Sequence, residues 1–126
     1  MLFRSVASTV AHDSHNLLVM GTNPEDMTFA ANELAKTGGG MIAVADGQVL
    51  AHVSMPIAGL MSDQPLETVV AQVQQLEKAW QDLGSPLHAP FMTFSLVALP
   101  VIPEVRISNR GLVDVTKFEL IDVIRH

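Results

Sequence analysis

The residues best suited to chemistry in this 126-residue chain lie together near its start, at residues 12–16, in the order His-Asp-Ser-His-Asn. This segment, called the HDSHN loop below, offers imidazole, carboxylate, hydroxyl and amide groups that can bind a polar ligand or serve a neighbouring catalytic site. Apolar runs at residues 6–11 and 17–20 flank it and are typical of buried strands. The sequence therefore predicts a polar loop where two strands end, a usual place for binding residues.

Three narrower interpretations of the loop compete with that one. His12 and His15 could begin a metal site, but only Asp13 or Asn16 is near enough in sequence to supply a third, weak ligand. Ser14, His15 and Asp13 could form a nucleophilic triad, but adjacent residues rarely reach that geometry and no glycine elbow surrounds the serine. A structural turn, in which the short polar side chains satisfy backbone groups, also fits the pattern.

The composition describes one domain, residues 1–126, with a surface poor in charge. Only 16% of the residues are charged, against about 25% in typical globular domains, and residues 47–62 and 83–103 carry no charged side chain. Such segments favour packing against another chain or domain. The net charge of −6 argues against nucleic-acid binding, and the lack of cysteine excludes disulfides and cysteine nucleophiles. With no long apolar run and no signal-peptide pattern, we expect a cytoplasmic protein that does not bind membranes.

The hydrophobic pattern predicts a single layered domain of the α/β or α+β class, with a mixed sheet and two main helices. The first helix follows Asn23, an N-cap, and ends at the glycines of residues 38–40. The second spans residues 65–83, where apolar residues recur at three- and four-residue spacing. Asp46-Gly47 predicts a hairpin turn. Strands are expected at residues 3–10, 17–20, 41–45, 49–53 and 118–124.

Some segments leave alternatives open. The glycines of residues 38–40 form either a turn that another segment approaches closely or a loose connection, and they follow a helix, which does not suit an anion. Residues 91–99 alternate in hydropathy, which favours a strand, although a short buried helix fits almost as well. His52 alternates with Val53 and is expected on an exposed strand face, and Trp80 is expected in the core or an interface.

Seven motifs in the chain resemble the C-terminal domain of bacterial adenine deaminases. They are VAHDSHN (10–16), GTN (21–23), GGG (38–40), PIAGLMSD (56–63), PFMT (90–93), ALPVIPE (98–104) and GLVDV (111–115). They occur in the family's order and cover nearly the whole chain. PIAGLMSD and ALPVIPE are long and unusual strings, so the resemblance is specific.

The resemblance implies an amidohydrolase of purine salvage, which converts adenine and water into hypoxanthine and ammonia. In such enzymes a (β/α) barrel holds divalent metal ions, manganese or iron, through histidines that include a His-x-His pair, and the metal activates water. This chain has no His-x-His and is too short for a barrel of about 250 residues. The resemblance therefore implies a domain that docks on the N-terminal barrel, holds no metal by itself and is inactive alone, in a homo-oligomeric enzyme.

The resemblance also makes the HDSHN loop a candidate for lining the purine pocket or for orienting a metal ligand. His15 is the first choice, followed by Asp13 and Ser14, and no residue is assigned a catalytic step. The PIAGLMSD segment, apolar and without charge up to Ser62, is a second candidate surface for contact with the barrel. Its candidate interface residues are Pro56, Ile57, Leu60 and Met61. A free-standing purine-binding or protein-interaction module without catalysis is the alternative function, and a self-sufficient metal hydrolase is a third.

Overall fold

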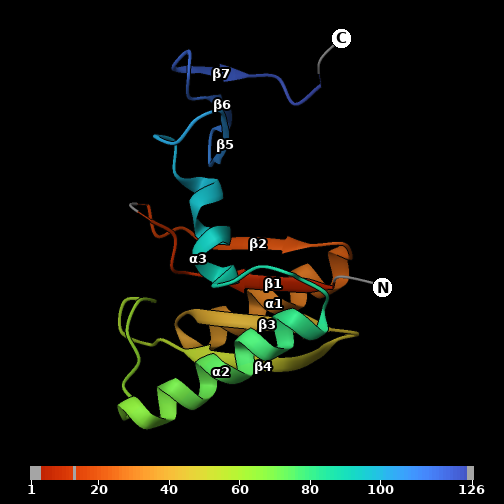
Figure 1. Ribbon diagram of the computed structural model, residues 1–126, viewed down its shortest axis with the longest axis vertical. Coiled ribbons are helices and arrows are strands. Elements are labelled where there is room, and N and C mark those ends of the chain that lie inside the picture. Colours follow the sequence, from red (N-terminus) through yellow and green to blue (C-terminus); the bar gives the residue numbers. More distant parts are fainter. Residues whose placement is uncertain (1–3, 13, 125–126) are drawn as a thin grey trace.

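The computed structural model describes residues 4–12 and 14–124, which form an α+β fold with two antiparallel sheets (Figure 1). The larger sheet has the strand order β2-β1-β3-β4, and the smaller has the order β5-β6-β7. In chain order, the elements are β1 (Ser5–Ser8), β2 (Leu18–Gly21), α1 (Pro24–Thr37), β3 (Gly40–Ala45), β4 (Gln48–Ser54), α2 (Leu66–Asp82), α3 (Pro90–Ser95), the 3₁₀ helix η1 (Leu96–Ala98), β5 (Val105–Ser108), β6 (Gly111–Asp114) and β7 (Glu119–Ile121).

The α+β alternative is confirmed, but the expectation of a mixed sheet is wrong. Every strand pairing in the described part of the chain is antiparallel. Helix α1 does connect two strands of the same direction, β2 and β3, as in a parallel unit. However, β1 lies between these strands and pairs antiparallel with both. The two parallel strands are therefore not neighbours in the sheet.

The four-stranded sheet lies between helices, with α1 on one face and α2 on the other (Figure 1). Successive side chains of a strand point to opposite faces. Val6 therefore packs with α2 and α3, while Ala7 packs with α1. In β3, Ile42 and Val44 face α1 and Ala43 faces the other core. Because both faces are covered, these strands contain apolar runs without polar alternation.

Helix α1 begins and ends at the residues that the sequence predicts. Asn23 Oδ1 accepts hydrogen bonds from two backbone N–H groups of the first turn, and Gly38 ends the helix in the left-handed conformation, with φ 79°. Asp26 in the same first turn is buried. Its carboxylate accepts hydrogen bonds from the backbone N–H groups of Asp46 (3.1 Å) and Gly47 (2.8 Å). Asp26 therefore also holds the predicted β3–β4 hairpin turn in place.

Helix α2 closes the larger core with one apolar face. Leu76, Ala79 and Trp80 are buried on the sheet, which places Trp80 in the core. The rings of Trp80 and Phe91 make a T-shaped contact with centroids 4.8 Å apart, and the ring of Phe94 lies 6.3 Å from that of Trp80. These contacts join α2 to α3 and complete the packing on this face of the sheet.

The segment at residues 91–99 is helical, so the strand favoured from its hydropathy is wrong. Pro90 occupies the first position of α3, where the missing N–H costs no hydrogen bond. Phe94, Ser95 and Ala98 are buried, and their spacing places them on one side of α3 and η1. Over so short a segment, the hydropathy of a half-buried helix can alternate as it does in a strand.

The C-terminal sheet lies beyond α3, away from α1 and α2 (Figure 1). Its last strand, β7, lies inside the predicted strand at residues 118–124, while β5 and β6 were not predicted. A turn at Asn109 and Arg110 connects these two strands as a hairpin. Across residues 4–12 and 14–124, no helix is both long and apolar enough to cross a lipid bilayer.

Candidate functional site

The HDSHN loop connects β1 to β2, as predicted, and forms a compact turn. The backbone N–H of Ser14 donates to the carbonyl oxygen of His12 (2.9 Å), and that of His15 donates to the carbonyl oxygen of Ala11 (2.7 Å). His15 adopts a left-handed backbone with φ 45°. Asp13 lies outside the described residues. The described backbone thus forms a turn through its own N–H and C=O groups, and the side chains of Ser14 and Asn16 make none of these hydrogen bonds.

The side chain of His12 points toward the core and contacts α3. Its Nδ1 lies 2.8 Å from Oγ of Ser95, a buried residue 83 positions later in the chain. The Ser95 hydroxyl donates its proton to the carbonyl oxygen of Met92 at 2.7 Å, because that oxygen can only accept. His12 Nδ1 therefore carries a proton and donates to Ser95, whether the imidazole is neutral or charged. This hydrogen bond fastens the HDSHN loop to α3.

A hollow of about 300 Å³ lies beside the loop, at the meeting point of three chain segments. The segments are the end of the HDSHN loop with the start of β2, the residues around the end of η1, and the β5–β6 turn. The described lining residues are Ser14, Asn16, Leu17, Leu18, Ala98, Pro100, Ile107, Ser108 and Asn109. His12 is not among them, and neither is His15, which is exposed on the surface. The structure thus brings two of the predicted residues, Ser14 and Asn16, into one hollow.

The hollow combines apolar walls with polar groups that have no partner among the described residues. Leu17 and Ile107 are 46% and 52% exposed, so apolar surface of both side chains lies open to solvent beside the polar groups. The side chains of Ser14, Asn16 and Asn109 make no hydrogen bond to another described residue. None of the described lining residues carries a charge. Such a surface suits an uncharged ligand with polar edges.

The described residues do not fit a metal site. Within residues 4–12 and 14–124, no group of three His, Asp or Glu side chains lies close enough to hold a metal ion. His12 is engaged with Ser95 through one ring nitrogen.

The second candidate surface, residues 56–63, is anchored to the end of β1. Thr9 Oγ1 donates to the carbonyl oxygen of Gly59 (2.6 Å) and accepts from the N–H of Gly40 (2.8 Å). Gly39 has φ 123°, and a Cβ there would lie 2.5 Å from Cα of Gly59. Of the two alternatives for the glycine turn, close approach by another segment is thus correct.

The four candidate interface residues differ in exposure. Ile57 and Met61 are 45% and 59% exposed and pair through a backbone bridge. Pro56 is exposed and Leu60 is half-buried. Their contact with another part of an enzyme stays a prediction.

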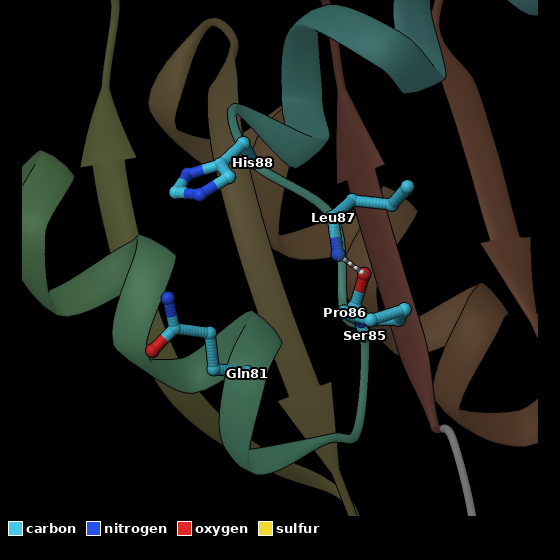
Figure 2. A pocket seen from close by; sticks show the side chains of 5 residues that line it. All are labelled: Gln81, Ser85, Pro86, Leu87 and His88. Carbon is cyan, nitrogen blue, oxygen red and sulfur yellow. Dashed lines mark hydrogen bonds between the residues drawn. The ribbon is translucent and has the colours of Figure 1, made fainter.

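Another hollow, of about 220 Å³, lies at the end of α2 and contains none of the predicted site residues. Figure 2 shows Gln81 on α2 below the loop that carries His88. Within that loop the N–H of Leu87 donates to Ser85 Oγ at 3.3 Å. Its described lining offers one imidazole and one amide but no carboxylate, so it lacks the paired groups that acid–base chemistry needs.

His52 is half-buried next to α1, so the prediction of an exposed strand histidine is wrong. Its Nε2 lies 3.4 Å from Thr37 Oγ1 at the end of α1. Burial lowers the pKa of His52 below its ordinary value of 6.5, and the carboxylate of Glu33 opposes this with a smaller upward effect. The error arose because alternation was taken to mean one exposed face, whereas helices cover both faces of this sheet.

A family profile described as "Adenine deaminase C-terminal domain" matches residues 3–119. The chain belongs to this family. Relatives named adenine deaminase occur in Moorella thermoacetica (59% identical over 120 residues), Clostridium botulinum (55% over 119) and Brucella melitensis (52% over 117). These matches cover 95%, 94% and 93% of this chain and 20% of each relative. The resemblance seen in the motifs is thus confirmed, and the chain spans about a fifth of the length of these curated relatives.

In this adenine deaminase C-terminal domain, the residues that complete the site come from later segments that sequence reasoning did not assign to it. Ser95 holds His12, and Asn109 on the β5–β6 turn faces the same hollow as Asn16. The ALPVIPE motif supplies Ala98 and Pro100 and was noted only for its resemblance. In the sequence, VAHDSHN and ALPVIPE are connected only because both resemble the same family.

Proposed function

We propose that this chain is the C-terminal part of an adenine deaminase and helps to form the purine site of the complete enzyme. That enzyme would hydrolyse adenine to hypoxanthine and ammonia. The observation that carries the proposal is that two family motifs, VAHDSHN and ALPVIPE, both line the hollow beside the HDSHN loop. Relatives named adenine deaminase support the choice of reaction.

In this proposal the chain binds and orients the purine, while the chemical step depends on the rest of the enzyme. The hydroxyl of Ser14 and the amide of Asn16 can hydrogen-bond polar edges of a neutral base, and Leu17 can cover its apolar face. Ser95 fixes the ring orientation of His12, so the loop keeps one arrangement. The manganese or iron ions implied by the resemblance would be held by the N-terminal barrel.

The proposed partner is that barrel, in the part of the relatives that this chain does not match. The exposed Ile57 and Met61, within the uncharged residues 47–62, suit such a contact. A cytoplasmic, homo-oligomeric enzyme of purine salvage remains a prediction of the resemblance.

The deciding experiment replaces the C-terminal fifth of the Moorella thermoacetica adenine deaminase with this chain and measures ammonia release from adenine. We expect the hybrid to be active and the enzyme truncated before this region to be nearly inactive. In the hybrid, Asn16→Ala is expected to lower kcat/KM by about tenfold, equal to about 1.4 kcal/mol of transition-state stabilisation, because Asn16 lines the hollow. Asn32→Ala, on the exposed face of α1, is the matched control. A truncated enzyme as active as the hybrid would contradict the proposal.

The second candidate, a free-standing purine-binding module, is favoured by the fact that three segments of this one chain build the hollow. It predicts that the isolated chain binds adenine while the hybrid enzyme releases no ammonia. The first function predicts an active hybrid, so the two assays separate the candidates.

A further inference from the structure

The hollow beside the HDSHN loop has a chemistry that selects among ligands. Its described lining contains no lysine, arginine or histidine that could neutralise a phosphate, and the chain carries a net charge of −6. Its volume of about 300 Å³ lies at the lower end of the range of about 300–1,000 Å³ for small-molecule pockets. These features favour a small, uncharged ligand over a nucleotide.

The walls favour a flat ligand. Leu17, Pro100 and Ile107 come from three different segments, and all three are largely exposed. A ring system placed against them would remove this apolar surface from water. Purine bases combine such a ring with hydrogen-bonding edges.

The two asparagines of the lining supply groups for those edges. Asn16 and Asn109 each present a carbonyl oxygen and an NH₂ group side by side, without a hydrogen bond to another described residue. An asparagine amide can pair with adenine by accepting from the exocyclic amino group and donating to N7. Hypoxanthine carries a carbonyl oxygen in place of that amino group, so the same edge offers two acceptors that one amide cannot satisfy.

We propose that this hollow binds an uncharged purine base by itself, and that Asn109 is a specificity-determining residue that favours adenine over hypoxanthine. The choice of adenine as the base rests on the function proposed above. Through Asn109, the β5–β6 turn would bind adenine, the substrate of the deamination, more tightly than hypoxanthine, its product.

Separate hydrogen bonds hold the two walls of the hollow in place. Ser108 Oγ donates to the carbonyl oxygen of Gly111 (2.9 Å) across the turn that carries Asn109. On the other side, His12 is bonded to Ser95 (2.8 Å) and fastens the HDSHN loop. The hollow is therefore formed before a ligand arrives, which lowers the entropy cost of binding.

The test titrates the ¹⁵N-labelled chain with adenine, hypoxanthine or adenosine monophosphate and follows the backbone amide resonances. Adenine is expected to shift resonances of residues 14–18 and 107–109, and the other two probes are expected to bind about tenfold more weakly. Asn109→Ala is expected to weaken adenine binding about tenfold and to remove the preference over hypoxanthine. Asn32→Ala, on the exposed face of α1, is the matched control. The same spectra report whether each variant is folded.

The proposal is overturned if adenine causes no shifts up to its solubility limit, if the shifts lie elsewhere, or if Asn109→Ala binds adenine and hypoxanthine as the unaltered chain does. These failures are distinct from failure of the proposed function. If the hybrid enzyme is active but adenine shifts no resonance of the isolated chain, only the proposed base site is rejected. If adenine shifts resonances of the hollow but the hybrid is inactive, the proposed deaminase function is rejected and the base site is supported.

Discussion

The two sheets of this chain are built from similar residues but differ in what covers them. In the four-stranded sheet, Val6, Ile42 and Val53 are fully buried because helices pack on both faces. In the three-stranded sheet, Ile107 and Leu120 are 52% and 57% exposed. The larger sheet is therefore a complete core, whereas the smaller one keeps apolar side chains in water.

This difference in burial indicates which sheet contributes more to the free energy of unfolding. Burial of apolar area contributes about 25 cal/mol per Å², so side chains at 0% exposure contribute the most. Phe118, which precedes β7, is 87% exposed and contributes almost nothing of this kind. A small sheet without a packed face is only marginally stable by itself. The larger sheet therefore carries the fold, and the smaller one adds the β5–β6 turn to the hollow.

The comparison is tested most severely by removing one aromatic side chain from each region. Trp80→Ala is expected to lower the free energy of unfolding by about 3–5 kcal/mol, because it leaves a cavity against Phe91 and Phe94. Phe118→Ala, the matched control, is expected to change it by less than about 0.5 kcal/mol. Urea unfolding followed by circular dichroism measures both. Equal losses would show that the smaller sheet is covered in solution.

A smaller effect is expected from Asp26, the buried carboxylate that holds the β3–β4 turn. Asp26→Ala removes two hydrogen bonds to a charged acceptor, and hydrogen bonds of this kind contribute about 1.5–3 kcal/mol each. We expect a net loss of about 2 kcal/mol, because water replaces part of the interaction. Glu25→Ala, at an exposed position in the same helical turn, is the control in the same unfolding assay. A loss no larger than that of the control would contradict this role.

Removing the hydrogen bond between His12 and Ser95 tests whether it holds the HDSHN loop against α3. Ser95→Ala is expected to cost about 1.5 kcal/mol, because the hydrogen bonds of Ser95 Oγ with His12 and with the carbonyl oxygen of Met92 are both lost, while His12 is only half-buried. In ¹⁵N spectra of the unaltered chain at neutral pH, His12 is expected to show a protonated Nδ1, and Ser95→Ala is expected to change that pattern. Ser85→Ala, in the loop after α2, serves as the control. A predominant Nε2–H form in the unaltered chain would refute the assigned geometry.

The smallest effect is expected for the pH dependence of stability, through the protonation of His52. Because its pKa is lowered in the folded chain, the unfolded chain binds more protons between the folded value and 6.5. Stability is therefore expected to rise with pH through this window and to fall as the pH drops below about 6.5. His52→Gln is expected to flatten this slope, measured by urea unfolding at several pH values, while the exposed control His88→Gln leaves it in place. An unchanged slope in His52→Gln would exclude His52 as its source.

Local chemistry made part of the fold predictable. Asn23, Gly38 and the Asp46-Gly47 turn act through neighbours within a few residues, and the structure has each where the sequence predicts it. The helix at residues 90–95 was predicted only as the alternative to a strand, and the strands β5 and β6 were not predicted. Short elements carry too few residues for their periodicity to separate one structure from another.

The candidate site was predictable only in part, for a related reason. The HDSHN loop stood out because polar residues interrupt apolar runs. Its partners Ser95 and Asn109 follow more than 80 residues later, and no spacing rule connects residues so far apart. Their places depend on how α3 and the β5–β6 turn pack, which is decided by the whole fold.

Thr9 has a consequence for how this protein tolerates change. Its single hydroxyl holds both Gly40 and Gly59, and Gly39 has no room for any side chain. In a library of all single substitutions, Thr9, Gly39 and Gly40 would form an almost invariant group, although none carries a charge or belongs to the HDSHN loop. Substitution there would displace the HDSHN loop and the PIAGLMSD segment together. A screen scored by activity alone would therefore count these residues as part of the reaction, when their contribution is to hold two surfaces in register.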